Sequence, residues 1–143
     1  MFNLHPQLIN DGIVLGEFEL STLLLSNDAQ FPWFILVPRR EGVTELYQLS
    51  PVDRAQLLDE SCVLAETLSQ VFAADKLNIA ALGNMVSQLH VHHIVRYQTD
   101  PAWPAPVWGK LPAVPYGSEQ LAERIARLKA AQIEGFVFAE QFR

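Results

Sequence analysis

The chain has 143 residues, of which 50% are hydrophobic and 18% are charged, and its formal net charge is -6. This length and apolar content suit one domain with its own buried core, which we expect to span residues 1–143. The negative charge argues against non-specific binding to nucleic acid or to an anionic membrane surface. The single cysteine, Cys62, excludes an internal disulfide and a four-cysteine zinc site.

The N-terminus shows no basic region followed by an apolar stretch, so the sequence predicts no signal peptide. No apolar run reaches the ~18 residues that a transmembrane helix requires. We therefore expect a cytoplasmic protein.

The first elements in chain order are a short helix and a strand region. Pro6 suits the start of a helix near residues 5–10, which Asp11-Gly12 would end. Residues 13–25 have the composition of β-strand, with Gly16 as a turn between two pieces.

A second apolar strand is expected over residues 31–37, followed by the first long helix. Ser50 is a good N-cap, Pro51 suits the first helical position, and Asp53 stands where a capping box has its acid. Apolar residues then recur at helical spacing to about residue 75. Cys62 lies within this pattern, which predicts a small buried core residue.

The second half begins with a short strand over residues 77–82 and then the histidine-bearing strand over residues 88–97. Residues 98–117 are rich in proline and read as a loop. Ser118 would cap a final helix to about residue 131, and residues 136–138 are β-like. Strands joined mostly by short turns indicate an antiparallel α+β domain.

Three of the four histidines lie in the histidine-bearing strand. Strand side chains alternate between the two faces of a sheet. One face would carry Gln88, His90, His92 and Ile94, and the other Leu89, Val91, His93 and Val95. A polar face with two imidazoles backed by a mostly apolar face is typical of an active-site strand, because imidazole can act as nucleophile, acid, base or metal ligand near neutral pH.

Three interpretations of the two aligned histidines remain open from the residues alone. His90 and His92 could bind one zinc ion, but a catalytic site needs about three protein ligands. Outside the strand the only other histidine is His5, and Cys62 lies in the predicted helix, so a carboxylate would have to supply the third ligand. His90 and His92 could also be histidines without a chemical role, whose ring nitrogens are hydrogen-bonded on a solvent-exposed strand face. They could also serve nucleophilic catalysis, in which one imidazole attacks phosphorus and the other contacts the phosphoryl oxygens. His93 points to the other face and is expected to be structural or at an interface.

The motif Gln88-Leu89-His90-Val91-His92-His93-Ile94 resembles that of the histidine triad (HIT) superfamily of nucleotide hydrolases and transferases, with glutamine at the first histidine position. It is most similar to a bacterial branch described as diadenosine tetraphosphate hydrolase-like. The segments Phe31–Arg39, Leu82-Gly83-Asn84 and Trp103–Gly109 carry the resemblance further, over roughly residues 5–110. It implies a HIT-like α+β fold with a mainly five-stranded antiparallel sheet and two principal helices.

By position, the resemblance makes His90 the nucleophile that forms a nucleotidyl-histidine intermediate, and His92 the group that contacts the phosphate or leaving group. Gln88 replaces the first histidine, which mainly supports the site. An amide donates and accepts hydrogen bonds but does not titrate, so backbone support of the His90 ring would survive and a proton relay would not.

The resemblance also suggests residues that bind the nucleotide. Asn84 and Ser87 would supply neutral donors to the phosphate, although strict alternation places Ser87 on the face of Leu89. Asn27 or Asp28 would hold the ribose hydroxyls; both also suit an ordinary turn. Trp103 and Trp108 are expected either to form a lid over the leaving group or over the neighbouring subunit's site, or to anchor the proline-rich loop or a dimer. Of the two, Trp103 is the one we assign to the nucleotide site.

The sequence therefore predicts a dinucleoside polyphosphate hydrolase-like enzyme that cleaves nucleotide phosphoanhydrides or phosphoramidates and forms a homodimer. No tightly bound cofactor and no protein-bound metal are expected, although a divalent cation could accompany the substrate phosphates. The partner is a nucleotide, with no nucleic acid and no membrane. The alternatives are a purine-nucleotide-binding module with little turnover and a metal-binding protein that uses His90 and His92.

Overall fold

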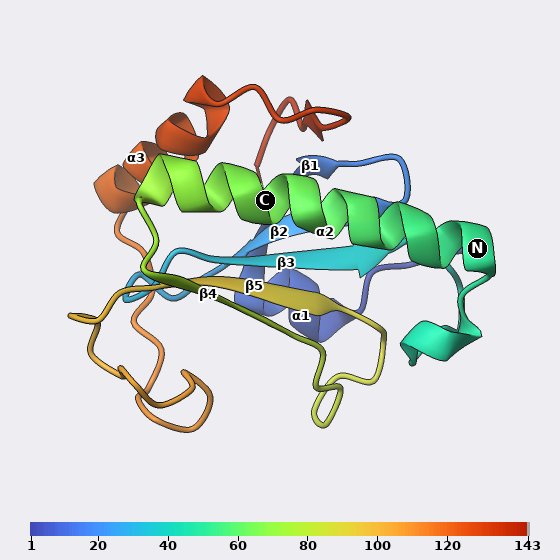
Figure 1. Ribbon diagram of the computed structural model, residues 1–143, viewed down its shortest axis with the longest axis horizontal. Helices are drawn as coiled ribbons and strands as arrows, with labels where there is room; N and C mark the ends of the chain where they lie inside the picture. The colour runs from blue at the N-terminus through green and yellow to red at the C-terminus, as the bar shows by residue number, and fades with distance from the viewer. Residues whose placement is uncertain (143) are drawn as a thin grey trace.

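The computed structural model describes residues 1–142, which form one six-stranded antiparallel sheet with helices on both faces (Figure 1). The helices are α1 (Pro6–Asp11), the 3-10 helix η1 (Leu46–Gln48), α2 (Pro51–Phe72) and α3 (Ser118–Ala130). The strands are β1 (Gly12–Glu17), β2 (Ser21–Ser26), β3 (Trp33–Pro38), β4 (Lys76–Ala80), β5 (Val91–Arg96) and β6 (Val137–Phe138). They lie in the order β4-β5-β3-β2-β1-β6. The α+β class is confirmed, with one strand more than the five expected.

The N-terminus of α2 is formed as its sequence predicts. The Ser50 side chain accepts a hydrogen bond from the backbone N–H of Asp53 at 3.1 Å, and Pro51 occupies the first turn. The helix ends at Ala73, which adopts a left-handed conformation with φ of 50° and so stops the helical hydrogen bonding. These two ends fix the length of α2 across the sheet.

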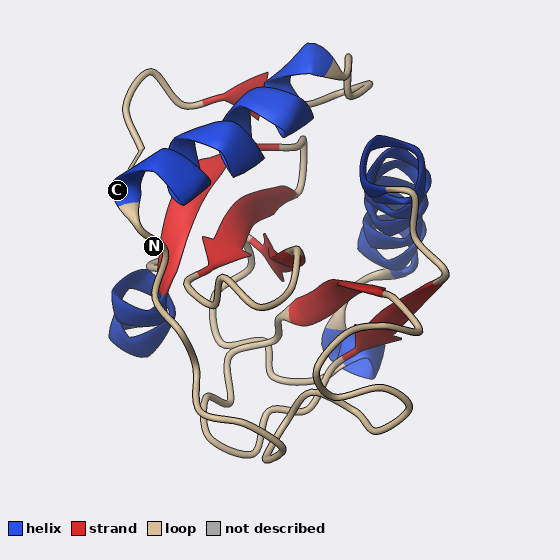
Figure 2. Cartoon of the chain, turned by 90° about the vertical axis from the view of Figure 1, so that its left-hand side faces the viewer, coloured by secondary structure: helices blue, strands red, loops and turns tan. Residues whose placement is uncertain are grey.

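The two faces of the sheet are covered by different elements, and Figure 2 shows the sheet between α2 on one side and α1 on the other. The larger core lies under α2 and α3 and includes Leu23, Leu25, Phe34, Leu36, Leu57, Leu64, Leu68, Phe72 and Leu128. A smaller cluster joins α1 to the opposite face and includes Leu8, Leu24, Ile35, Val37 and Val86. His92 pairs with Ile35 across β5 and β3, so it shares this second face.

The turn between β1 and β2 is not at Gly16, as the sequence suggested, but at residues 18–20, where Phe18 N–H donates to the Ser21 carbonyl at 2.8 Å. Gly16 instead lies inside β1, where the register shifts between Val14 and Gly16. A Cβ at Gly16 would stand 2.1 Å from the carbonyl oxygen of Val137. Glycine is therefore needed here because β6 lies directly against the backbone of β1.

Two further expectations need correction. Cys62 is exposed and not in the core. The buried residues of α2 follow one stripe through Glu60 and Leu64, and Cys62 lies between them on the opposite side of the helix. The N-cap of α3 is Gly117, so Ser118 is the first helical residue; the Gln120 side chain accepts the Gly117 N–H at 3.2 Å.

Among the helices of residues 1–142, none combines the length and the apolar character that crossing a bilayer would need.

Candidate active site

His90 lies immediately before β5 and is buried, with 7% of its surface exposed. Its Nδ1 is 2.7 Å from the backbone carbonyl oxygen of Gln88. A carbonyl oxygen only accepts hydrogen bonds, so Nδ1 carries the proton and donates it. In the neutral ring Nε2 therefore holds the lone pair, which is the form that a nucleophilic imidazole requires.

His92 stands beside His90 on the same face of the sheet, with ring centroids 4.9 Å apart. Its Nδ1 accepts a hydrogen bond from the indole Nε1–H of Trp33 at 2.9 Å. Burial lowers the pKa of His92 from 6.5 to about 3, with smaller contributions from the charges of His90 and His93. His92 is therefore a neutral group at physiological pH.

His93 points to the opposite face, into the core beneath α2. Its Nε2 lies 2.7 Å from the Ser61 hydroxyl, and its Nδ1 donates to the carbonyl of Val91 at 3.1 Å. Burial lowers its pKa to about 4, although the bond to Val91 works in the other direction. The separation of His93 from the other two histidines follows the strand alternation expected from the sequence.

The side chain of Gln88 is turned to the N-terminal segment. Its Oε1 accepts the backbone N–H of His5 at 2.9 Å, and its Nε2 donates to the carbonyl of Asn3 at 2.8 Å. These bonds place the neighbouring Phe2 and Leu4 against the apolar cluster under α1. The amide thus holds a chain segment, while the backbone of the same residue holds His90.

A cavity of about 320 Å³ adjoins His90. Ser87, Gln88 and His90 line it together with residues of the segments 44–47 and 81–83. Ser87 is exposed in this cavity, and the chain before Val91 is not part of β5, so the strict alternation that argued against Ser87 does not hold there. Asn84 is exposed on the same loop.

Asn27 and Asp28 hold the chain that leads to α3. The Asn27 side-chain oxygen accepts the Tyr116 N–H at 2.9 Å. Asp28 Oδ1 accepts the backbone N–H of Gln30 at 3.1 Å and that of Val114 at 3.3 Å. Asp28 is buried, with 5% exposed, and in this conformation its carboxylate binds the backbone of the loop.

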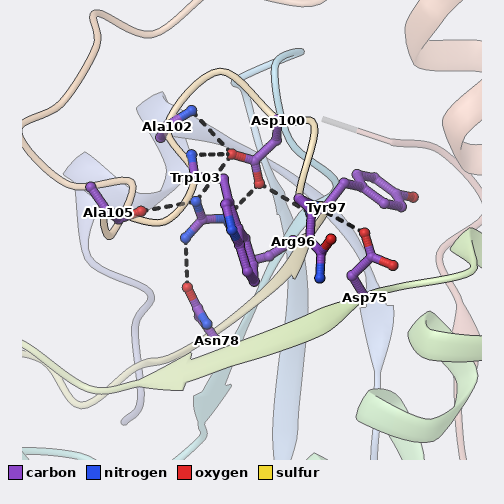
Figure 3. A network of polar contacts seen from close by, with 9 residues as sticks. Asp75, Asn78, Arg96, Tyr97, Asp100, Ala102, Trp103 and Ala105 are labelled. Carbon is purple, nitrogen blue, oxygen red and sulfur yellow. Dashed lines mark hydrogen bonds and ion pairs between the residues drawn. The ribbon is translucent and has the colours of Figure 1, made fainter.

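Trp103 lies against a buried ion pair in the proline-rich loop (Figure 3). The guanidinium of Arg96 donates to both carboxylate oxygens of Asp100 at 2.8 and 3.1 Å, and also to the side chain of Asn78 and the carbonyl of Ala105. It stands 5.7 Å from the Trp103 ring centroid. Trp103 therefore packs within the proline-rich loop, and its expected role at the nucleotide stays a prediction.

The pKa of the Asp100 carboxyl reflects this network. Its burial would raise the pKa, but the Arg96 guanidinium and three backbone N–H groups outweigh burial and lower the pKa to about 2. The three N–H groups belong to Tyr97, Ala102 and Trp103. The loop is therefore organised around a carboxylate that stays ionised.

Sequence reasoning gave Trp33 no role in the site and did not link Trp108 to His92. The Trp108 ring lies edge-on to His92 with centroids 5.1 Å apart, and edge-on to Trp33 at 5.9 Å. Trp33 could have been placed near His92 from strand pairing, because it opposes Ile94 and is thus diagonal to His92. No sequence signal places Trp108, because its loop follows no strand or helix period.

Residues 1–142 contain no cluster of three or more histidine, cysteine, aspartate or glutamate side chains arranged to hold a metal ion.

Residues 7–99 match the sequence model of the HIT domain. The chain belongs to the HIT family. HIT proteins generally bind or hydrolyse nucleotides. No curated protein gave a significant match.

Several solved HIT structures are similar over nearly their whole length. A histidine triad protein from Marinobacter aquaeolei is 55% identical, with a TM-score of 0.89 over 91% of this chain and 95% of its own. One from Sinorhizobium meliloti is 43% identical, with a TM-score of 0.88 over 91% and 96%. One from Bradyrhizobium japonicum is 42% identical, with a TM-score of 0.88 over 90% and 96%.

Proposed function

We propose that this HIT protein hydrolyses a nucleotide phosphoanhydride or phosphoramidate through a nucleotidyl intermediate on His90. The observation that carries the proposal is the hydrogen bond from His90 Nδ1 to the Gln88 carbonyl, which leaves the Nε2 lone pair free for attack. The acceptor of this bond is a backbone carbonyl, so glutamine at position 88 supports the His90 ring as well as histidine would. The adjoining cavity gives a substrate access to His90.

In the first step His90 Nε2 attacks the α-phosphorus, forming a P–N bond while the P–O or P–N bond to the leaving group breaks. The leaving group departs with the bonding electron pair and takes up a proton. The His90 ring becomes cationic, and its Nδ1–H remains bonded to the Gln88 carbonyl. Water then attacks phosphorus, the bond to His90 breaks, and the nucleoside monophosphate is released.

The remaining site assignments follow the resemblance. His92 contacts the phosphate or leaving group, Ser87 and Asn84 donate to the phosphate, and Asn27 or Asp28 receives the ribose. For Asp28 this requires the bonds to the loop at Gln30 and Val114 to be shared or exchanged.

The first substrate class to test is the dinucleoside polyphosphates, as expected for a diadenosine tetraphosphate hydrolase-like branch. A divalent cation would accompany the substrate phosphates, and two copies of the chain would form a homodimer.

The test is turnover of diadenosine tetraphosphate and adenosine phosphoramidate with and without a chelator. His90→Asn should abolish turnover, at least about 10³-fold, because the nucleophile is gone. The matched control is His5→Asn: His5 caps α1 through its Nδ1, and asparagine is itself a strong N-cap. This control should keep full activity and stability.

Chelator-resistant turnover that His90→Asn abolishes supports the covalent mechanism. If adenosine nucleotides bind but no substrate turns over, the protein is a nucleotide-binding module. Loss of folding stability with chelator alone would instead favour the metal-binding alternative.

A further inference from the structure

Within residues 1–142, His92 makes one hydrogen bond to another side chain, and its partner is Trp33. The indole Nε1–H donates to His92 Nδ1 at 2.9 Å. An indole nitrogen can only donate a hydrogen bond, so the nitrogen it meets must hold a lone pair. Of the two neutral forms of His92, this selects the one with the proton on Nε2.

The indole is held in this position by its neighbours. Trp33 opposes Ile94 in the pairing of β3 with β5, which brings its long side chain diagonally towards His92. Phe31 lies edge-on to it at a centroid distance of 6.5 Å, and Trp108 at 5.9 Å. Trp108 also lies edge-on to His92 at 5.1 Å, so both partners of the hydrogen bond are fixed by aromatic packing.

The two site histidines are then held in opposite forms. The Gln88 carbonyl puts the proton of His90 on Nδ1 and leaves Nε2 bare. The Trp33 indole puts the proton of His92 on Nε2 and occupies Nδ1. Along one short segment of the chain, a backbone acceptor therefore prepares His90 as a nucleophile and a side-chain donor prepares His92 as a hydrogen-bond donor.

We propose that Trp33 is a positioning residue that sets the tautomer of His92, so that His92 presents an Nε2–H donor to the phosphoryl or leaving-group oxygen. The catalytic consequence of this inference rests on the proposed function. The tautomer of His92 is independent of that function. Because the indole cannot accept a proton, His92 acts here as a fixed donor and does not pass a proton on through Trp33.

The first measurement is nitrogen-15 NMR of the histidine side chains in the unmodified protein at pH 7, assigned with a His92→Asn sample. Nitrogens with and without a proton resonate in well-separated regions. We expect His92 to show a protonated Nε2 and an unprotonated Nδ1. The reverse pattern, or an even mixture of the two forms, overturns the proposal whether or not the protein turns over any substrate.

The second measurement compares Trp33→Phe with Trp108→Phe. Both replace an indole that packs against His92, tilted to its ring in the case of Trp33 and edge-on in the case of Trp108, but only the first removes a donor to it. We expect Trp33→Phe to give a mixture of His92 tautomers and Trp108→Phe to keep the Nε2–H form. An unchanged tautomer in Trp33→Phe overturns the proposal.

Kinetics then test the consequence. For Trp33→Phe we expect kcat to fall by about 2- to 5-fold with KM essentially unchanged, because the substrate still binds while the donor is present in only part of the population. A loss confined to KM would show that Trp33 acts as a wall of the binding site and would overturn the positioning role. If the unmodified protein has no turnover, the proposed function fails, and the NMR result still decides the tautomer.

Discussion

Gln88 acts through its backbone and its side chain on different parts of the molecule. The carbonyl oxygen holds the His90 ring, and the carboxamide binds the backbone of Asn3 and His5. Glutamine suits the second task because it supplies a donor and an acceptor at once. The departure from the histidine triad therefore ties the N-terminal segment to the chain just before β5.

This role predicts a local effect of Gln88→Met, which keeps the length of the side chain and removes both hydrogen bonds. We expect a loss of about 1–2 kcal/mol in the free energy of unfolding and faster hydrogen exchange in residues 1–6. Gln70→Met on the exposed side of α2 is the matched control and should change stability by less than about 0.5 kcal/mol. Unchanged exchange in the N-terminal segment would contradict this role of Gln88.

At the same scale, the sequence could predict how the three histidines divide, because strand alternation depends only on spacing. His90 and His92 share a face and His93 is turned into the core, as alternation requires. The sequence could not predict the contacts of Gln88 or Trp108. Their partners lie in segments without regular periodicity, and only tertiary packing brings those segments to the site.

Among the elements, the start of the long helix α2 could be predicted to the residue, because capping is a local property, whereas its end at Phe72 comes before the expected end near residue 75. The turn between β1 and β2 could not. Gly16 looks like a turn residue, but it is required by the approach of β6, a strand more than one hundred positions later in the chain. The sixth strand was likewise visible only as a β-like tail.

The proline-rich loop after β5 depends on one buried ion pair. Asp100 accepts hydrogen bonds from Arg96 and from three backbone N–H groups of the loop (Figure 3). The same loop carries Trp108 to His92. Both charged side chains are nearly inaccessible, with 2% and 3% exposed. Removing one charge leaves the other buried without a partner.

Asp100→Asn should therefore destabilise the protein by about 3–5 kcal/mol in denaturant titration and increase proteolysis within residues 98–109. The control is the more exposed pair of Arg40 and Asp53, where Arg40→Gln should cost less than about 1 kcal/mol. Equal losses in the two variants would show that the Asp100 network is not what organises the loop.

For the molecule as a whole, the buried histidines link stability to pH. The pKa of His92 is lowered to about 3 and that of His93 to about 4, from 6.5, mainly by burial. Below pH 6.5 the unfolded chain binds protons that the folded protein does not, so stability falls as pH falls. The contribution of the two neutral histidines to the free energy of unfolding is fully present above pH 6.5. It is lost progressively as the pH falls to about 4 for His93 and about 3 for His92.

Chemical denaturation at pH 8, 7, 6 and 5 tests this linkage. We expect nearly constant stability between pH 8 and 7 and a decline of up to about 1.4 kcal/mol per pH unit for each of the two histidines below pH 6. His5→Asn should show the same decline, because it leaves both buried histidines in place. Constant stability from pH 7 to pH 5 would contradict the burial of two neutral imidazoles.

The sheet ends differently on its two sides. On one side β6 contributes only two residues, and they cover the part of β1 around Gly16. On the other side β4 offers five residues of strand with no further strand beyond it in the described chain. Short edge strands resist the addition of another chain, whereas longer ones accept it. Two copies joined through β4 would thus present outward the two-residue strand β6 and the part of β1 that β6 does not cover. Such short edges disfavour growth by strand addition beyond a pair.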